Sequence, residues 1–105
     1  GITPKNDADG CMQDIHWPSG LLGYFPSYTY GAIIASMLMK SAKEQYSSIG
    51  TELQSGNFTS LNKYLNENLR SFGSSKISAD LLKAATGHDT VQPTIFIDYL
   101  KGKYL

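Results

Sequence analysis

One short stretch near the N-terminus of this 105-residue chain holds most of the side chains that could do chemistry. It reads GCMQDIHWPSGLLGYFPSY, and its polar candidates are Gln13, Asp14, His16, Tyr24 and Tyr28. A neutral imidazole and a phenolic hydroxyl can each donate a hydrogen bond to a developing oxyanion. A neighbouring carboxylate can hold the imidazole in one tautomer. The stretch therefore suits the stabilisation of negative charge that forms during a reaction.

Other chemistries are less well supported by the same residues. His16 and His88 lie far apart, and no HExxH or CxxC motif is present, so we do not predict a complete metal site in this chain. Cys11, His16 and Asp14 could form a nucleophilic system only in a geometry that spacing does not give. A structural interpretation also stays open, in which Asp14 holds a buried His16 beneath Trp17.

Charge, hydrophobicity and cysteine content limit the partners and the cellular location that the sequence predicts. Nine basic and nine acidic residues give no net charge, so neither nucleic acid nor an anionic membrane is predicted as a partner. The strongest apolar run, Ala32–Met39, is far shorter than the ~20 residues of a membrane span. The single cysteine excludes an internal disulfide, and no signal-peptide pattern opens the chain. These features predict a cytoplasmic protein.

The elements that must position these residues are helical. Residues 1–23 are rich in Gly, Pro, Asp and Asn and are expected to form loops, and no alternating pattern predicts a strand. Ser27 and Gly50 are expected to bound the first helix, and Gly73 and Gly87 to end later ones. Helices are predicted over residues 27–49, 51–54, 58–72, 79–86 and 94–103, with Pro93 in the first turn of the last one.

The first predicted helix is apolar around its whole circumference. Its large apolar residues project in nearly every direction, and such a helix must be buried on every side. The other helices are too few and too short to wrap it. We therefore expect a covering partner, either a second copy or the rest of a larger fold.

The polar stretch resembles one family closely. Gly10-x-x-Gln13-Asp14-x-His16-Trp17 is similar to the GxxQDxHW motif of the carboxypeptidase Taq family of zinc metallocarboxypeptidases. The match continues through the run GYFPSY and through the later helices. The further matching positions are Gly31, Ala35, Gly56, Phe58, Ala84, Thr86, Gly87, Phe96, Tyr99, Leu100, Lys103 and Tyr104. The resemblance covers essentially the whole chain but only about the last fifth of a family member.

The resemblance implies a fold and a division of labour. It implies an all-α, neurolysin-like metallopeptidase fold with a deep groove, of which this chain is the C-terminal helical subdomain. Residues 1–105 would form one unit, with 1–26 as a loop-rich active-site wall and 27–105 as helices. The family releases C-terminal residues from peptides with zinc or cobalt, held by an HExxH helix and a downstream Glu. None of these ligands lies in this chain, so it would bind no metal itself.

The resemblance also implies residue roles. His16 and Tyr24 would donate to the oxyanion of the tetrahedral intermediate, as the catalytic groups of this wall. Gln13 and Asp14 would orient His16 or the peptide backbone. Tyr28 is a weaker candidate for donation to the oxyanion and is otherwise grouped with Gln13 and Asp14 as a residue that binds the substrate or orients its neighbours.

The partners implied are the remaining N-terminal part of the enzyme and a peptide substrate. The chain alone should be inactive. The alternative is a non-catalytic helical fragment of a truncated or split gene that self-associates, and a homo-oligomer is left open in either case.

Overall fold

The chain is built from helices and loops and contains no strand. A computed structural model describes all residues, 1–105. Its α-helices are α1 (Phe25–Gln45), α2 (Ile49–Gln54), α3 (Thr59–Asn68), α4 (Ser78–Thr86) and α5 (Pro93–Tyr104). Three short 3-10 turns are η1 (Asp7–Asp9), η2 (Cys11–Gln13) and η3 (Arg70–Phe72). The predicted all-α class is confirmed.

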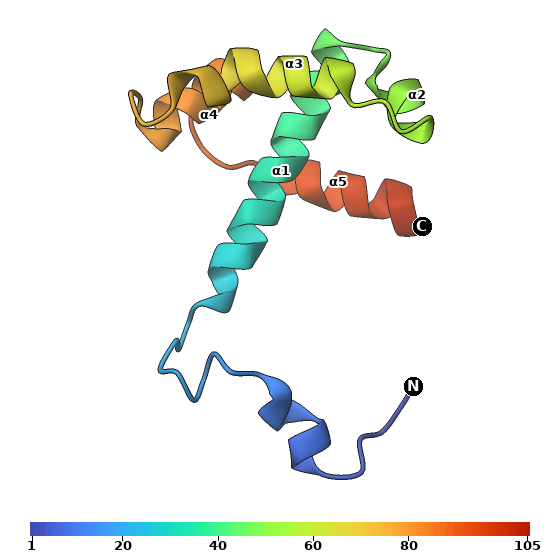
Figure 1. The fold of residues 1–105 in the computed structure, drawn as a ribbon, viewed down its shortest axis with the longest axis vertical. Helices are drawn as coiled ribbons and strands as arrows, with labels where there is room; N and C mark the ends of the chain where they lie inside the picture. Colours follow the sequence, from blue (N-terminus) through green and yellow to red (C-terminus); the bar gives the residue numbers. More distant parts are fainter.

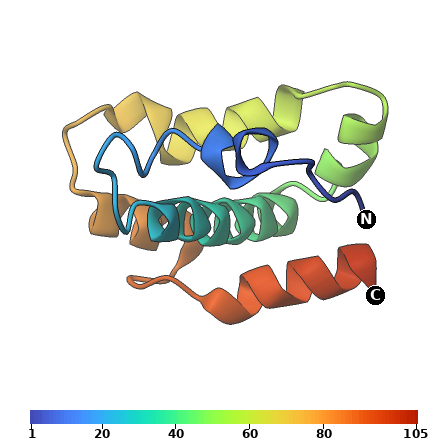
Figure 2. The ribbon, with the colours of Figure 1, turned by 90° about the horizontal axis from the view of Figure 1, so that it is seen from below.

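Helix α1 is the axis of the molecule, and α2 to α5 all contact it. They gather around its C-terminal half, with α3 crossing one end (Figure 1). In the view from below, α1 lies between α3 on one side and α5 on the other (Figure 2). The first turns of α1 and the preceding loop extend away from this cluster of helices (Figure 1). The polar stretch of the sequence therefore lies apart from the helical core.

Helix α1 begins two residues before the predicted start. Tyr24 is its N-cap residue, and Pro26 lies within its first turn, where a missing N–H costs no helical hydrogen bond. The Ser27 hydroxyl does not cap the helix; it donates to the Tyr24 carbonyl at 2.6 Å. The helix therefore includes Phe25 and Pro26, which the sequence-based boundary after residue 26 assigned to the loop.

Helix α1 also ends earlier than predicted. It stops at Gln45, with Tyr46 in an extended conformation, and Gly50 lies inside α2 rather than ending α1. Ile49 is the reason for the early turn, since it is fully buried against α1 and α3. The chain must reverse after Tyr46 to bring this side chain back onto Ala42. Burial of one apolar side chain outweighs the weak preference for continuing the helix.

The predicted helix over residues 58–72 is interrupted. Helix α3 ends at Asn68, Leu69 leaves helical geometry, and a 3-10 turn carries the chain to Gly73. The Asn68 side chain donates to the Tyr64 carbonyl at 2.9 Å, the kind of local bond by which asparagine competes with a helical backbone. The remaining ends fit the prediction closely: Gly87 closes α4 at a φ of 77° and α5 starts at Pro93.

The core is small, and the carbonyl of Ala85 accepts hydrogen bonds from two of the helices that form it. Ala42, Ile49 and Tyr64 form its fully buried centre. The Tyr64 hydroxyl donates to the Ala85 carbonyl at 2.7 Å, and the Ser41 hydroxyl donates to the same oxygen at 2.7 Å. Helices α1, α3 and α4 therefore meet at the end of α4, where carbonyls have no helical partner.

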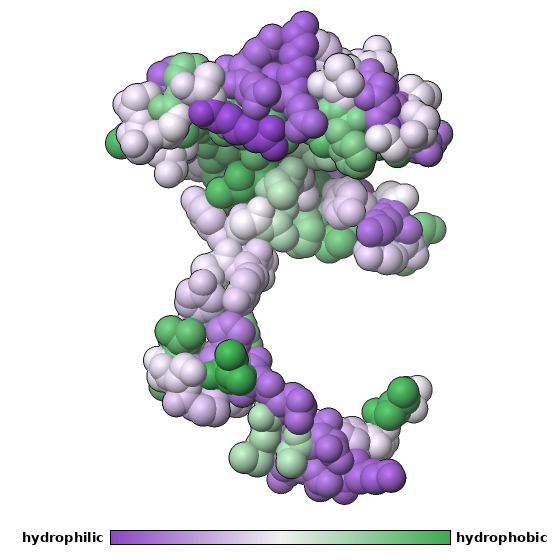
Figure 3. Space-filling model, viewed as in Figure 1, coloured by the Kyte–Doolittle hydropathy of each residue, from purple (hydrophilic) through white to green (hydrophobic).

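Much apolar surface stays uncovered. Only 6 of 105 residues are buried, and the radius of gyration is 17.8 Å, against about 13 Å for a compact chain of this size. Apolar surface gathers where α1 meets the crossing helices, whereas the outer side of that cluster is polar (Figure 3). No helix combines the length and the apolar character that a bilayer span requires.

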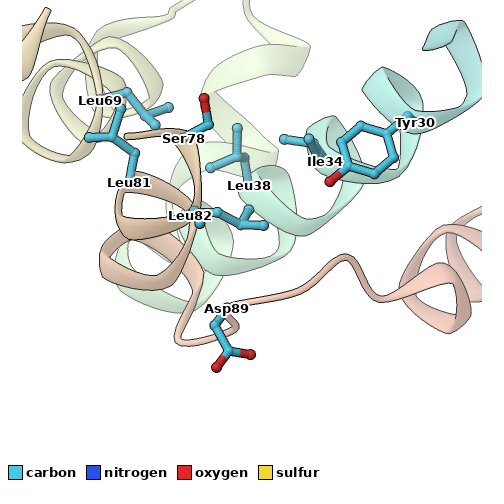
Figure 4. Close-up of a pocket in the computed structure, with 9 residues that line it drawn as sticks. Tyr30, Ile34, Leu38, Leu69, Ser78, Leu81, Leu82 and Asp89 are labelled. Atoms are coloured by element: carbon cyan, nitrogen blue, oxygen red, sulfur yellow. The ribbon is translucent and has the colours of Figure 1, made fainter. Parts of the chain in front are cut away.

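An apolar groove of about 470 Å³ lies between α1 and α4. Tyr30, Ile34 and Leu38 line it from α1, and Leu81 and Leu82 face them from α4 (Figure 4). The open groove lies along the helix that was predicted to need a cover on every side.

Candidate functional site

The loop before α1 fixes His16 through a single carboxylate oxygen. Asp14 Oδ1 accepts the backbone N–H of His16 at 2.7 Å and lies 3.0 Å from the ring nitrogen Nδ1. Aspartate readily accepts a backbone N–H two residues later, so the sequence Asp-x-His favours this turn. The turn then closes through the Leu21 N–H, which donates to the His16 carbonyl at 2.9 Å. His16 is thereby held through both its backbone and its imidazole ring.

The first turn of α1 supplies the other side of the site. Tyr28 lies three residues after Phe25 and four after Tyr24, so its side chain lies next to each of them at the start of the helix. The Tyr28 hydroxyl lies 3.0 Å from His16 Nε2. Tyr24 stacks on the imidazole with ring centroids 5.6 Å apart, and Phe25 meets it edge-on at 5.1 Å.

The hydrogen bonds determine how protons are arranged on His16. A carboxylate only accepts hydrogen bonds, so Nδ1 must carry a proton to bond with Asp14. The neutral ring then has a lone pair at Nε2, which accepts the Tyr28 hydroxyl. In this arrangement neutral His16 has no N–H left to donate to another group. It can donate from Nε2 only when both nitrogens carry protons.

The Asp14 carboxylate is held in its charged form. The backbone N–H of His16 is the main cause that keeps the pKa of Asp14 below its ordinary value of 3.8. Partial desolvation opposes the shift, and the hydrogen bond and charge of the His16 ring add to it. Asp14 is therefore a permanent acceptor at neutral pH.

The site is accessible. The His16 side chain is 26% exposed, and Tyr24 and Tyr28 are 44% and 55% exposed. The side chains that contact the ring all come from residues 14–28. Trp17 does not cover the ring and is itself 63% exposed. Within this chain His16 is thus no buried core pair, and the open side of the ring faces outward.

Gln13 is placed apart from the ring. Its amide donates to the Ala8 carbonyl in the preceding loop and makes no hydrogen bond with His16. The structure thus brings four of the five candidates together, namely Asp14, His16, Tyr24 and Tyr28. The contacts of Phe25 and Tyr28 with the His16 ring were not predicted from the sequence. The spacing of four residues between the two tyrosines was the signal that placed both on one face.

No group of His, Cys, Asp and Glu side chains in this chain could hold a metal ion. Cys11 is an exposed free thiol, and both nitrogens of His16 are bonded to other groups. The arrangement can therefore bind and orient an oxygen-bearing group, but the geometry of a thiol activated by histidine is not present.

Known proteins resemble the chain along its whole length. Carboxypeptidase 1 of Bacillus subtilis is 38% identical over 104 residues, which is 99% of this chain and 21% of that protein. Thermostable carboxypeptidase 1 of Pyrococcus furiosus is 33% identical over 105 residues, again 21% of its length. The counterpart from Thermus thermophilus is 32% identical over 20% of its length. This chain therefore spans about a fifth of the curated relatives that it matches.

Solved structures give the same picture. A crystal structure of BsuCP superposes on 99% of this chain with a TM-score of 0.81 at 38% identity, covering 21% of that chain. A structure of CHT matches with the same TM-score at 36% identity. The profile of one family, described as Carboxypeptidase Taq (M32) metallopeptidase, matches residues 1–104. On this match, and on the helical fold and motif described above, the chain belongs to the carboxypeptidase Taq (M32) metallopeptidase family.

Proposed function

We propose that this chain forms one wall of the active site of a metal-dependent carboxypeptidase that releases C-terminal amino acids from peptides. It would be the C-terminal part of such an enzyme, working with an N-terminal part. The hydrogen-bonded set of Asp14, His16 and Tyr28, open on one side, carries this proposal. Preorganised hydrogen-bond donors at the position where negative charge develops are what the oxyanion of a tetrahedral intermediate requires.

The proposed roles follow from the proton arrangement. Tyr24 donates to the oxyanion through its hydroxyl, and His16 donates from Nε2 in the form that carries protons on both ring nitrogens. Asp14 fixes the orientation and tautomer of His16. The Tyr24 hydroxyl is free for this because only its ring contacts other members of the site. Tyr28 supports His16 through the Nε2 bond. Gln13 would orient the peptide backbone from the loop rather than orient His16.

The side chains of residues 1–105 do not form a site for the metal ion that the family name implies. The family is described as one of metallopeptidases, whereas these 105 residues contain no group of three or more His, Cys, Asp or Glu side chains that could hold a metal ion. We therefore assign zinc or cobalt binding to the remaining part of the enzyme, and we derive no step for it here. The chain contributes binding, orientation and hydrogen-bond donation.

A chimera tests the proposal. Residues 1–105 would replace the matching segment of Carboxypeptidase 1 of Bacillus subtilis, and release of C-terminal amino acids from blocked dipeptides would be measured with zinc or cobalt. The proposal predicts metal-dependent release by the chimera, and none by this chain alone or by the relative without its segment. A folded but inactive chimera would contradict the proposal, as would metal-dependent release by this chain alone.

One observation favours a second candidate. The apolar groove between α1 and α4 is open, so a chain without its N-terminal part would be expected to self-associate. This candidate is a non-catalytic helical fragment that forms homo-oligomers. Light scattering of the isolated chain distinguishes the two outcomes when it is combined with the chimera assay, since an oligomeric chain with an inactive chimera supports only this second candidate.

A further inference from the structure

The apolar groove between α1 and α4 has the length of a binding site for one further helix. Tyr30, Ile34 and Leu38 line one side of it at intervals of four residues, so they form a single row along α1. Eight residues of helix rise about 12 Å, which sets the length of this row. Two turns of an amphipathic helix, with apolar side chains at positions i, i+4 and i+7, span about the same length. The groove therefore matches the apolar stripe of a helix.

The lining of the groove is almost entirely apolar. Leu69 after α3, together with Leu81 and Leu82 of α4, lines the side opposite the row on α1 (Figure 4). Asp89 is the only charged residue of the lining, and it forms no ion pair within the chain. Its carboxylate points away from the leucines (Figure 4). A groove of about 470 Å³ with this lining favours an apolar occupant over a charged one.

The extent of the uncovered apolar surface indicates which partner covers it. A second, shallow hollow shares Tyr30 with the groove and is lined by Phe25, Pro26, Thr29, Tyr30 and Ile33. A cover must therefore reach around α1 on two sides at once. The match covers 21% of Carboxypeptidase 1 of Bacillus subtilis, so about four-fifths of that protein lies outside it. A part of that size can enclose α1 on several sides, whereas one helix of a second copy in the groove would leave the other hollow open.

We propose that the groove between α1 and α4 binds a helix of the N-terminal part of the enzyme, through apolar side chains spaced i, i+4 and i+7. This rests on the proposed function, in which an N-terminal part carries the metal. Tyr30 lines the groove only two residues after Tyr28, whose hydroxyl bonds to His16. A helix bound in the groove therefore fixes α1, and with it the position of the His16 site relative to the metal-bearing part.

Two alanines of α4 allow a matched test. Ala79 lines the groove and Ala84 does not, although both are exposed in this chain. Because five residues separate them, they project about 140° apart around the helix. Ala79→Cys and Ala84→Cys are made separately with Cys11→Ser, since Cys11 is itself an exposed thiol. In the isolated chain, at a concentration where light scattering shows a monomer, both new thiols should be alkylated at similar rates.

The same variants are then compared in the chimera with Carboxypeptidase 1. The thiol of Ala79→Cys should react about tenfold more slowly than in the isolated chain, or slower still, because the reagent reaches it only when the bound helix opens. The thiol of Ala84→Cys should keep its rate. An unchanged rate for Ala79→Cys would overturn the proposal, as would equal slowing at both positions. Slowing that is lost when the chimera is diluted would assign the groove to a second copy, and would also overturn it.

A charge placed in the groove tests its connection to the site. Ala79→Glu and Ala84→Glu introduce the same good helix former at exposed positions, so circular dichroism should show both isolated chains folded. In the chimera only Ala79→Glu puts a carboxylate between apolar surfaces, so it should lower turnover by about tenfold or more. Ala84→Glu should keep its turnover. Normal turnover in Ala79→Glu would contradict the proposal.

The failures of the two proposals are distinguishable. An active chimera in which Ala79→Cys stays reactive overturns this inference and leaves the proposed function standing. A folded chimera without metal-dependent release counts against the proposed function, while the alkylation rates still decide whether the groove is covered. A chimera that does not fold counts against both, because the groove and the N-terminal part would then not be complementary.

Discussion

Removing both donors to the Ala85 carbonyl should destabilise the helical core by more than the sum of the single losses. The perturbations are Tyr64→Phe, which keeps the ring but removes the hydroxyl, and Ser41→Ala. Each hydroxyl donates to the same oxygen at 2.7 Å, and Tyr64 is fully buried. No backbone N–H donates to this carbonyl, which lies near the end of α4.

The magnitude follows from the number of donors that remain. Either single variant leaves one hydrogen bond to Ala85, so each should lower the free energy of unfolding by about 1 kcal/mol. The double variant leaves a carbonyl with no partner in a residue that is only 5% exposed. Stranding a buried acceptor adds about 1–3 kcal/mol, so the double variant should lose about 3–5 kcal/mol.

The assay is urea unfolding of the chain, followed by far-UV circular dichroism, in a double-mutant cycle. Ser36→Ala is the matched control, because the Ser36 hydroxyl lies on the same helix but bonds only to the Ala32 carbonyl. Combined with Tyr64→Phe, this control should be additive. Additivity of Tyr64→Phe with Ser41→Ala within about 0.5 kcal/mol would refute the reasoning.

Three further predictions concern individual residues. The pKa of Asp14 in the folded chain lies below its ordinary value of 3.8, so its bonds to His16 stabilise the fold above pH 3.8. This stabilisation is lost as pH falls through the lowered pKa. A carboxyl NMR titration checks this, and a midpoint at or above 3.8 would contradict it. Glu52→Ala removes the acceptor for the Ser60 N–H in the first turn of α3 and should lower the urea midpoint of unfolding, with an unchanged midpoint as the adverse result. Gly87→Ala should lower the free energy of unfolding by about 1–2 kcal/mol because φ is 77°, and a stabilised variant would contradict the role of the left-handed cap.

Sequence patterns predicted the type of every helix but not all of their ends. Gly87 and Pro93 act locally, so their effect on α4 and α5 could be predicted from neighbouring residues alone. The end of α1 depends on Ile49 packing against Tyr64, a contact between residues far apart in the chain. Such tertiary burial is not visible in the spacing of residues along one helix.

The candidate site was partly predictable for the same reason. Asp14 and His16 are two residues apart, so a local turn brings them together. Tyr28 reaches His16 only because the loop folds back on the first turn of α1, and this return path has no signature in the sequence. The proton arrangement that excludes donation by neutral His16 required the positions of all three side chains.

The most direct measurement of the central claim is the comparison of kcat and KM for His16→Ala and Tyr24→Phe in the chimera. Groups that donate to an oxyanion act in the transition state, so each change should lower kcat by about 10²–10³-fold while KM changes only slightly. Equal losses in turnover and in peptide binding would contradict this account, because they would mean that His16 and Tyr24 only maintain the shape of the wall.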